Sequence, residues 1–277
     1  MRLMDAFVIA FSTYSRIPMP SAAWSEENRR YAMCFFPLVG ASVGLLLWGW
    51  LALCDALGVG PVLRGAAGAL IPLLVTGGIH MDGLMDTSDA LASWQPPERR
   101  LEILKDSHTG AFAVMACAGV LLLTAGLLSE ADAVTGWLLA PCFVLSRAMS
   151  AAALTVMKSA RPGGMLDGFA KAAHRRAVCL SSGIYAALCI VLWLVLGGPV
   201  QAVACLLAAG LCALGFARMA QRQFGGITGD LAGWLVQVTE LCLPAVIVMG
   251  GMLKRSSTSA AHIRGSSSWR ARKTRMR

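Results

Sequence analysis

Three aspartates in one short segment are the residues of this sequence best suited to chemistry. Asp82, Asp86 and Asp89 lie in the stretch GGIHMDGLMDTSDA. At 100° per residue, their carboxylates fall within about 60° of one another on one face of a helix. Like charges at this spacing repel and destabilise a helix, so the pattern is best explained by a bound cation.

A cluster made only of carboxylates points to a hard divalent ion such as Mg²⁺ or Mn²⁺. Such ions keep several waters and often bridge carboxylates to substrate phosphates, so the segment predicts metal-assisted phosphoryl transfer. The alternative is a solvated acidic helix start that holds no ligand. The adjacent Gly77, Gly78 and His80 favour the metal site over that alternative.

A second polar segment, PPERRLEILKDSHTGAF, follows closely. Its doubled proline predicts a helix start, and Arg99, Glu102 and Asp106 then fall on one helix face. Asp106 would add a metal ligand, while Arg99 and Lys105 would hold phosphate oxygens. The alternative is an amphipathic surface helix with internal ion pairs.

Two histidines and a glycine-rich turn complete the polar inventory. His80 and His108 flank the acidic loop and could bind a metal or a base edge, or could serve only as hydrogen-bonding residues. Glycines in FGGITGDLAGW would let the backbone approach a ligand, and their N–H groups could cradle a phosphate. The alternative is that these glycines serve only the close packing of membrane helices. The candidate residues of this turn are Gly225, Gly226, Thr228, Gly229 and Asp230.

Arg147 stands in the middle of an apolar stretch, APCFVLSRAMSAAALTVM. An unpaired charge there costs at least about 2.5 kcal/mol on insertion scales. We therefore expect Arg147 to face a polar cavity with an acidic or phosphate partner. Glu240 is its best counterpart by charge, and a plain buried ion pair is the alternative to a functional role.

The elements that must position these residues are membrane helices. Of the 277 residues, 57% are hydrophobic and only 14% are charged, a balance too apolar for an ordinary soluble domain. Seven stretches have about the 20 apolar residues that a spanning helix needs. The sequence predicts an all-α, polytopic helical bundle with six or seven spans and a cytoplasmic acidic active-site loop. The stretches are 34–54, 61–79, 111–128, 136–157, 178–196, 199–217 and 234–253.

Charge in the connecting segments predicts which side each faces. The polar segments 80–110, 158–176 and 218–233 contain Lys or Arg, so they and the N-terminus are expected in the cytoplasm. A seventh full span would place the basic C-terminal tail outside, against the same rule. Either the last stretch is re-entrant or partly buried, as Gln237 and Glu240 would allow, or the tail is tolerated outside.

The chain divides into a membrane-embedded catalytic domain, residues 1–253, and a basic tail, 254–277, predicted to be disordered. The tail holds eight of the 24 Lys and Arg and no acid, so the net charge of +9 does not indicate nucleic-acid binding. The stretch from Leu3 to Tyr14 predicts a short interfacial helix. All nine cysteines lie in or beside apolar segments and are interpreted as small hydrophobic residues.

Together these segments resemble the cobalamin synthase family, also called adenosylcobinamide-GDP ribazoletransferase. The motifs FSTYSRIPMP, FPLVGASVG, TGGIHMDGLMDTSDA, ERRLEILKDSHTGAF, LSRAM, GGITGD and TELCLP occur in the family's order and cover most of residues 7–250. GGIHMDGLMDTSDA and LEILKDS are the specific ones. Departures are Ala90 and Ala113, where glycine is common, and His108, where arginine is common.

The resemblance implies a late step of vitamin B12 assembly in a bacterial cytoplasmic (inner) membrane. Such enzymes join α-ribazole or its 5′-phosphate to adenosylcobinamide-GDP and release GMP, with Mg²⁺ required. Carried over to this sequence, Asp82, Asp86 and Asp106 would hold Mg²⁺ on the diphosphate and Asp89 would be the candidate base. Lys105 and Arg147 would position phosphate oxygens. The 225–230 turn, with His80, would bind a nucleotide portion.

Two other functions compete with this hypothesis. A CDP-alcohol phosphotransferase also uses a membrane-embedded aspartate motif, but its aspartates continue along one helix, which Pro96 and Pro97 interrupt here. A transporter would explain Arg147 and Glu240 as pathway residues, yet most acids lie in one interfacial loop and no internal repeat is evident. A scaffold would have no use for three carboxylates on one face. A homo-oligomer is compatible with the sequence.

Overall fold

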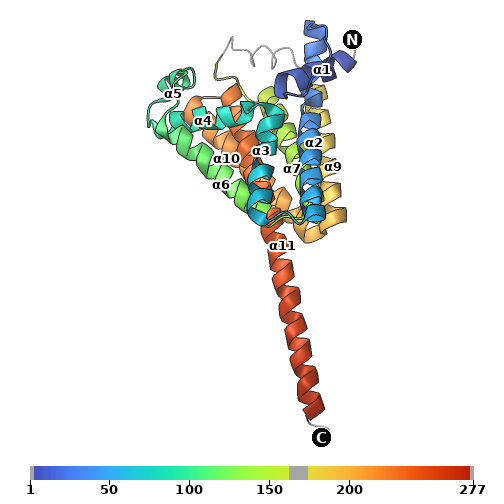
Figure 1. Cartoon of the computed structure of the whole chain (residues 1–277). Helices are drawn as coiled ribbons and strands as arrows, with labels where there is room; N and C mark the ends of the chain where they lie inside the picture. The colour runs from blue at the N-terminus through green and yellow to red at the C-terminus, as the bar shows by residue number, and fades with distance from the viewer. Residues whose placement is uncertain (1–2, 162–173, 275–277) are drawn as a thin grey trace.

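The computed structural model describes residues 3–161 and 174–274, with the side chains of the last helix described as far as Leu253. These residues form an all-helical bundle (Figure 1), which confirms the predicted fold class. The helices are α1 (Leu3–Tyr14), α2 (Glu26–Leu57), α3 (Pro61–Thr76), α4 (Ile79–Ala92), α5 (Pro97–Ile103), α6 (Ala111–Ser129), α7 (Ala133–Val156), α9 (Arg175–Gly197), α10 (Pro199–Phe224) and α11 (Gly229–Thr274).

Six helices are long and apolar enough to cross a membrane: α2, α6, α7, α9, α10 and the first 25 residues of α11. The bent pair α3 and α4 makes a seventh if it counts as one span. Each of the seven predicted apolar stretches is therefore helical over most of its length. The second, 61–79, runs three residues past the end of α3, and the fourth, 136–157, runs one residue past the end of α7. Lipid-facing side chains such as Leu122, Leu211 and Val195 are about 70% exposed or more, as expected for a bundle in hydrocarbon.

Successive spans run in alternating directions, so the connections gather at two ends of the bundle. Figure 1 shows α1, α4 and α5 at one end and the C-terminal end of α11 at the other. We call the first of these the aspartate end. Because α11 starts beside α4 and continues through the bundle, the last apolar stretch crosses it in full, and the re-entrant alternative does not apply. Which end faces the cytoplasm stays a prediction.

Helix ends follow the local sequence. Ser25 caps α2 by accepting a hydrogen bond from the N–H of Asn28, and Gly58 ends that helix in the left-handed conformation, with φ of 66°. Asp132 caps α7 through the N–H of Thr135, at 2.7 Å. Proline occupies the first position of α3, α5 and α10, where its missing N–H removes no helical bond.

Helix α7 is the centre of the bundle and packs against α2, α9 and α11. Its buried residues divide between two hydrophobic clusters. In the cluster at the aspartate end, the α7 residues pack with Phe11, Phe36 and Phe224 of other helices. In the other cluster they pack with Leu47 and Trp193. Arg147 of α7 lies where these two halves of the core meet.

At the end of the bundle opposite α4, an ion pair connects two of the helix–helix connections. The Arg64 guanidinium lies 2.9 Å from a carboxylate oxygen of Asp55 and donates to the carbonyl of Ala131 at 3.0 Å. Asp55 also accepts from the N–H of Ala133, the first residue of α7, at 2.8 Å. These contacts join the α2–α3 and α6–α7 connections.

Two predictions fall wholly or partly outside the described residues. The basic segment 158–176 is described only at its two ends, because residues 162–173 lie outside the description. The backbone of α11 is helical through Thr274, while the side chains of 254–277 lie outside the description. The division into a catalytic domain and a disordered tail stays a prediction.

Candidate active site

A sharp break between α3 and α4 creates the candidate site. Gly77 and Gly78 both have positive φ, 68° and 81°, and the two helix axes meet at 98°. Residues with a Cβ rarely take this conformation, so the glycines allow the turn. Helix α3 therefore runs along the bundle, whereas α4 lies across the aspartate end, outside the spanning segments.

Arg16 packs closely against Gly77. Its backbone N–H donates to the carbonyl of Val75 at 2.7 Å, which ties the segment after α1 to the end of α3. Its side chain then lies over Gly77, where an added Cβ would come within 2.4 Å of the Arg16 Nε. The arginine is thereby held beside the first turn of α4.

Two further glycines let α4 pack closely on the start of α11. A Cβ at Gly83 would lie 2.5 Å from the carbonyl oxygen of Asp230. A Cβ at Gly233 would lie 3.2 Å from the carbonyl oxygen of His80. The two helix backbones are therefore nearly in contact, and Asp230 joins the aspartates of α4.

The resulting acidic set is Asp82, Asp86 and Asp230. Burial, and then the negative charges of Asp82, Asp230 and Asp89, raise the pKa of Asp86 to about 6. Asp82 is exposed, whereas Asp86 and Asp230 are half-buried. Among the described residues, no three His, Cys, Asp or Glu side chains converge closely enough to enclose a metal ion. Asp82, Asp86 and Asp230 therefore offer hard oxygen ligands without surrounding an ion.

An open cleft of about 860 Å³ lies at the break between α3 and α4. Asp82 and Arg16 bring opposite charges to the same cleft, beside an apolar wall. Arg16 was not singled out in the sequence as a site residue, although it lies in the FSTYSRIPMP motif. The lining residues are Arg16, Leu73, Leu74, Gly77, Gly78, Ile79, Met81, Asp82 and Met85.

Asp89, the candidate base, is engaged with the backbone. Its two carboxylate oxygens accept hydrogen bonds from the N–H groups of Gly110 at 2.6 Å and Ala113 at 2.9 Å. These are the orphan N–H groups at the start of α6, and a carboxylate is favourable at a helix N-terminus. Asp89 therefore attaches α4 to the entry of a spanning helix. Its role as base stays a prediction.

The segment after α4 is a shorter helix than predicted. It begins at the doubled proline, and Arg99 pairs with Glu102 as expected, but α5 ends at Ile103. Asp106 therefore lies in the following loop instead of on the helix face. There its carboxylate accepts from the His108 N–H at 3.0 Å and lies 2.6 Å from Nδ1 of the same residue. These hydrogen bonds hold the pKa of Asp106 below its usual value.

The ends of α5 face different surroundings. Lys105, just beyond the helix, is exposed. Arg100 is buried and donates to the side chain of Gln223 near the end of α10. Arg161 donates to the carbonyl of Leu101 at 2.8 Å. The polar loop is thus docked on α10 and on the segment that follows α7.

The glycine-rich turn joins α10 to α11. Gly225 ends α10 with φ of 71°, and Gly226 fits against the backbone of Lys158. The Ile227 N–H donates to the carbonyl of Lys158 at 2.8 Å. Thr228 accepts from the N–H of Leu231 at 3.3 Å and so caps the start of α11. The turn thereby positions Gly229 and Asp230. Its role in nucleotide binding stays a prediction.

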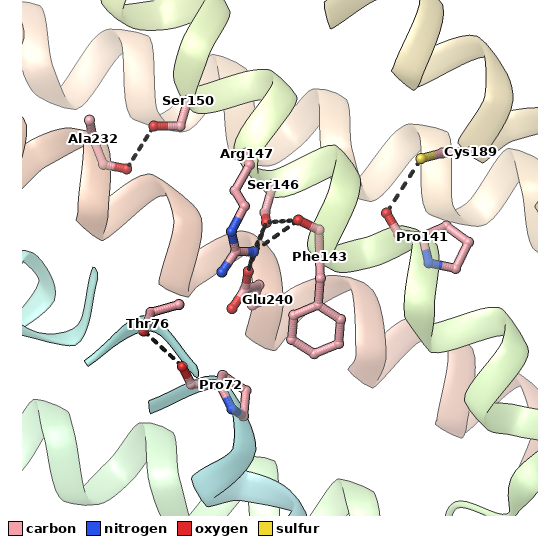
Figure 2. A network of polar contacts seen from close by, with 10 residues as sticks. All are labelled: Pro72, Thr76, Pro141, Phe143, Ser146, Arg147, Ser150, Cys189, Ala232 and Glu240. Atoms are coloured by element: carbon pink, nitrogen blue, oxygen red, sulfur yellow. Dashed lines mark hydrogen bonds and ion pairs between the residues drawn. The ribbon is translucent and has the colours of Figure 1, made fainter. Parts of the chain in front are cut away.

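The intramembrane charge of Arg147 is paired, as predicted, with Glu240 (Figure 2). Arg147 is fully buried, and Glu240 also accepts a hydrogen bond from Ser146 Oγ at 2.8 Å. The guanidinium donates to the carbonyl of Phe143 at 2.9 Å. Within the described residues, its Nε and Nη2 have no hydrogen-bond partner.

His80 links this pair to the aspartate end. Its ring centroid lies 5.6 Å from that of Phe36, and the Arg147 guanidinium lies 5.9 Å from the same Phe36 ring. His80 is buried, and its Nε2 has no partner among the described residues. Arg147 and His80, which belongs to the first turn of α4, therefore lie near the same buried aromatic ring.

Comparison with known proteins identifies the family. Residues 6–248 match the family described as cobalamin-5-phosphate synthase. The chain belongs to the cobalamin-5-phosphate synthase family. Relatives named adenosylcobinamide-GDP ribazoletransferase include one from Lachnoclostridium phytofermentans, 40% identical over 91% of this chain and 97% of the relative. The relative from Desulfitobacterium hafniense is 37% identical over 84% and 91%. No solved structure matches the chain.

In this synthase-family chain, the contact of α4 with α11 is open to a direct test. We expect Gly83→Ala to lower thermal stability in detergent, because forcing a methyl group into a packed contact costs about 1–3 kcal/mol. Gly119→Ala in α6 is the matched control, since a Cβ there meets nothing within 4 Å. Equal melting temperatures for the two variants would contradict the close packing.

The pairing of Arg147 with Glu240 predicts strong coupling. Removing either charge alone, in Arg147→Met or Glu240→Gln, should destabilise the protein by about 3–5 kcal/mol, because the other charge stays buried without its partner. The double variant should be much less unstable than the sum of the two. Unfolding titrations in mixed micelles measure this, and additive losses would show that the pair is not coupled.

Proposed function

We propose that this protein is an adenosylcobinamide-GDP ribazoletransferase of late cobalamin biosynthesis. It would join α-ribazole or α-ribazole 5′-phosphate to adenosylcobinamide-GDP and release GMP. The observation that carries the proposal is the acidic set Asp82, Asp86 and Asp230 beside an open cleft, in a chain whose relatives bear that name. Because a diphosphate and these carboxylates are both negatively charged, a hard cation such as Mg²⁺ is needed to hold them together.

The reaction balances as a substitution at phosphorus. A hydroxyl oxygen of the ribazole ribose forms a bond to the phosphorus that carries the cobinamide arm. The bond from that phosphorus to the bridging oxygen of GDP breaks, and GMP leaves with that oxygen. The hydroxyl proton passes to a base or to water. Positioning and electrostatic stabilisation are the main contributions that a protein makes to such transfers.

The chemistry of these carboxylate donors suits Mg²⁺. Exposed Asp82 and half-buried Asp86 and Asp230 offer carboxylate oxygens from two helices. Burial first, and then the neighbouring carboxylates, raise the pKa of Asp86. Mg²⁺ is commonly held by one or two carboxylates plus waters and substrate phosphates, so a fully enclosing cage is not required. When bound, the ion would neutralise diphosphate charge. Asp106 stays a predicted ligand, and it would have to exchange its bonds to His108 for the ion.

Cationic residues would hold the phosphate oxygens. Arg16 lines the cleft with Asp82, and its side chain lies over Gly77. Lys105 is exposed beyond α5, where it could contact a bound diphosphate. Arg147 is buried with Glu240, so we assign it a positioning role beneath α4. Thr228, in the 225–230 turn, would support Asp230 and the nucleotide.

The aspartate end is proposed to face the cytoplasm of a bacterial cell, with the bundle in the inner membrane. The connections at this end carry Arg and Lys, in line with the positive-inside rule, whereas the basic C-terminal tail would then be tolerated outside. Soluble nucleotide substrates would then reach the cleft directly. The substrates, Mg²⁺ and the bilayer are the partners that the proposal requires, whereas a homo-oligomer is not needed to complete the site.

Activity of the aspartate variants tests the proposal. Purified protein should release GMP from adenosylcobinamide-GDP and α-ribazole only when Mg²⁺ is present. Asp82→Asn, Asp86→Asn and Asp230→Asn should each lower the rate roughly 100-fold or more, because metal stabilisation of transition-state charge supplies several kcal/mol. Glu98→Gln, an exposed acid on α5, is the matched control and should keep the wild-type rate.

Folded wild-type protein that releases no GMP under these conditions would contradict the proposed reaction, and CDP-alcohol substrates would then be assayed. Full activity in the Asp230→Asn variant would remove that residue from the site. Full activity without any divalent ion would contradict the metal assignment.

The two roles of Asp89 can be separated. Asp89→Asn keeps a side-chain acceptor for the α6 backbone, whereas Asp89→Ala removes the cap and should lower stability by about 1 kcal/mol. If Asp89 is the base, both variants should lose activity equally in spite of their different stabilities. If it only positions α4, Asp89→Asn should keep most activity. Melting temperatures and GMP release, measured on the same preparations, decide between these results.

A further inference from the structure

Trp94 is an unusually placed tryptophan at the aspartate end. It directly follows Ser93, the C-cap of α4, and its φ of 55° makes it the one residue other than glycine with positive φ among those described. Helices often end with a left-handed residue, but that residue is usually glycine, because a Cβ is strained there. A bulky residue in this conformation therefore needs a physical reason.

The indole ring of Trp94 is not buried against the rest of the protein. Trp94 is 90% exposed, more than any other large hydrophobic residue described. It has no aromatic contact or hydrogen bond with the described part of the chain. The strain is thus not offset by aromatic contacts or hydrogen bonds within the described part of the fold, which points to a partner outside it.

The depth of Trp94 in the bundle follows from hydrogen bonds already described. Asp89 binds the first N–H groups of the spanning helix α6, so this part of α4 lies where α6 enters the membrane. Ser93 is one turn further, because its N–H donates to the Asp89 carbonyl at 3.1 Å. Since α4 lies across the spans, Trp94 stays at the same level.

The surface next to this point is apolar. The first turns of α6 expose Phe112, Val114 and Met115, each more than half accessible. Charged residues, Glu98 and Arg99, follow Trp94 in the chain. An exposed indole between a hydrocarbon-facing helix and a charged segment has the surroundings that tryptophan prefers at a membrane interface, where its ring is buried and its N–H is hydrated.

We propose that Trp94 inserts into the lipid headgroup layer beside α6 and fixes the depth of α4. The partner is the phospholipid surface, and the left-handed backbone at the end of α4 directs the indole outward to it. The acidic set on α4 would thereby be held at a constant height relative to the lipid headgroups. This inference does not depend on the proposed reaction.

Fluorine NMR of protein labelled with 5-fluorotryptophan, in lipid nanodiscs, tests the proposal. The chain has eight tryptophans, and the resonance missing from the Trp94→Phe variant belongs to Trp94. Lipids with a nitroxide on the headgroup should abolish that resonance, while a water-soluble gadolinium chelate should leave it visible. The reverse pattern would place the indole in water and overturn the proposal.

Two further measurements distinguish lipid contact from packing on the protein and from substrate binding. Trp94→Gly should melt in detergent at or above the wild-type temperature, because glycine relieves the strained backbone. A clear loss of stability would mean that the indole packs on the protein. Adding adenosylcobinamide-GDP should leave the Trp94 resonance and its broadening by headgroup nitroxide unchanged. A shift together with protection from the nitroxide would assign Trp94 to substrate binding instead of lipid.

Discussion

A helix can turn through 98° over two residues only where both take a conformation that side chains disfavour, and Gly77 and Gly78 meet this requirement. The turn converts what would be the end of a span into a helix that lies across the bundle. Asp82 and Asp86 consequently lie on a helix across the end of the bundle instead of in line with α3. The cleft, the contact with α11 and the capping of α6 by Asp89 all depend on that change of direction.

Most of the fold was predictable from apolar length, because a bilayer imposes the same requirement on every span. The predicted stretch 61–79 ran past Gly77, since hydropathy does not detect a break in direction. Length and composition also predicted the pairing of Arg147 with Glu240, because few other charges lie at that depth. Contacts between helices that are distant in the sequence could not be predicted from apolar length or charge.

Asp230 illustrates that limit. Its glycine-rich surroundings suggested nucleotide binding, but the same glycines also let two backbones meet, and only the structure shows that Gly83 lies against Asp230. Asp89 is a second example, since helix periodicity placed it with Asp82 and Asp86. Its oxygens reach the N-terminus of α6, 21 residues further along the chain, because α4 ends beside that helix. Sequence spacing could not reveal either tertiary contact.

The pairing of Arg147 with Glu240 also has a consequence for how the protein is made. The two residues are 93 positions apart, and α11 is synthesised after α7. At the usual rates of translation this separation corresponds to roughly 5–20 s. During that time α7 would sit in the membrane with an arginine whose acidic partner has not been synthesised. Insertion machinery, or neighbouring helices with bound water, would have to stabilise this charge until α11 has been synthesised.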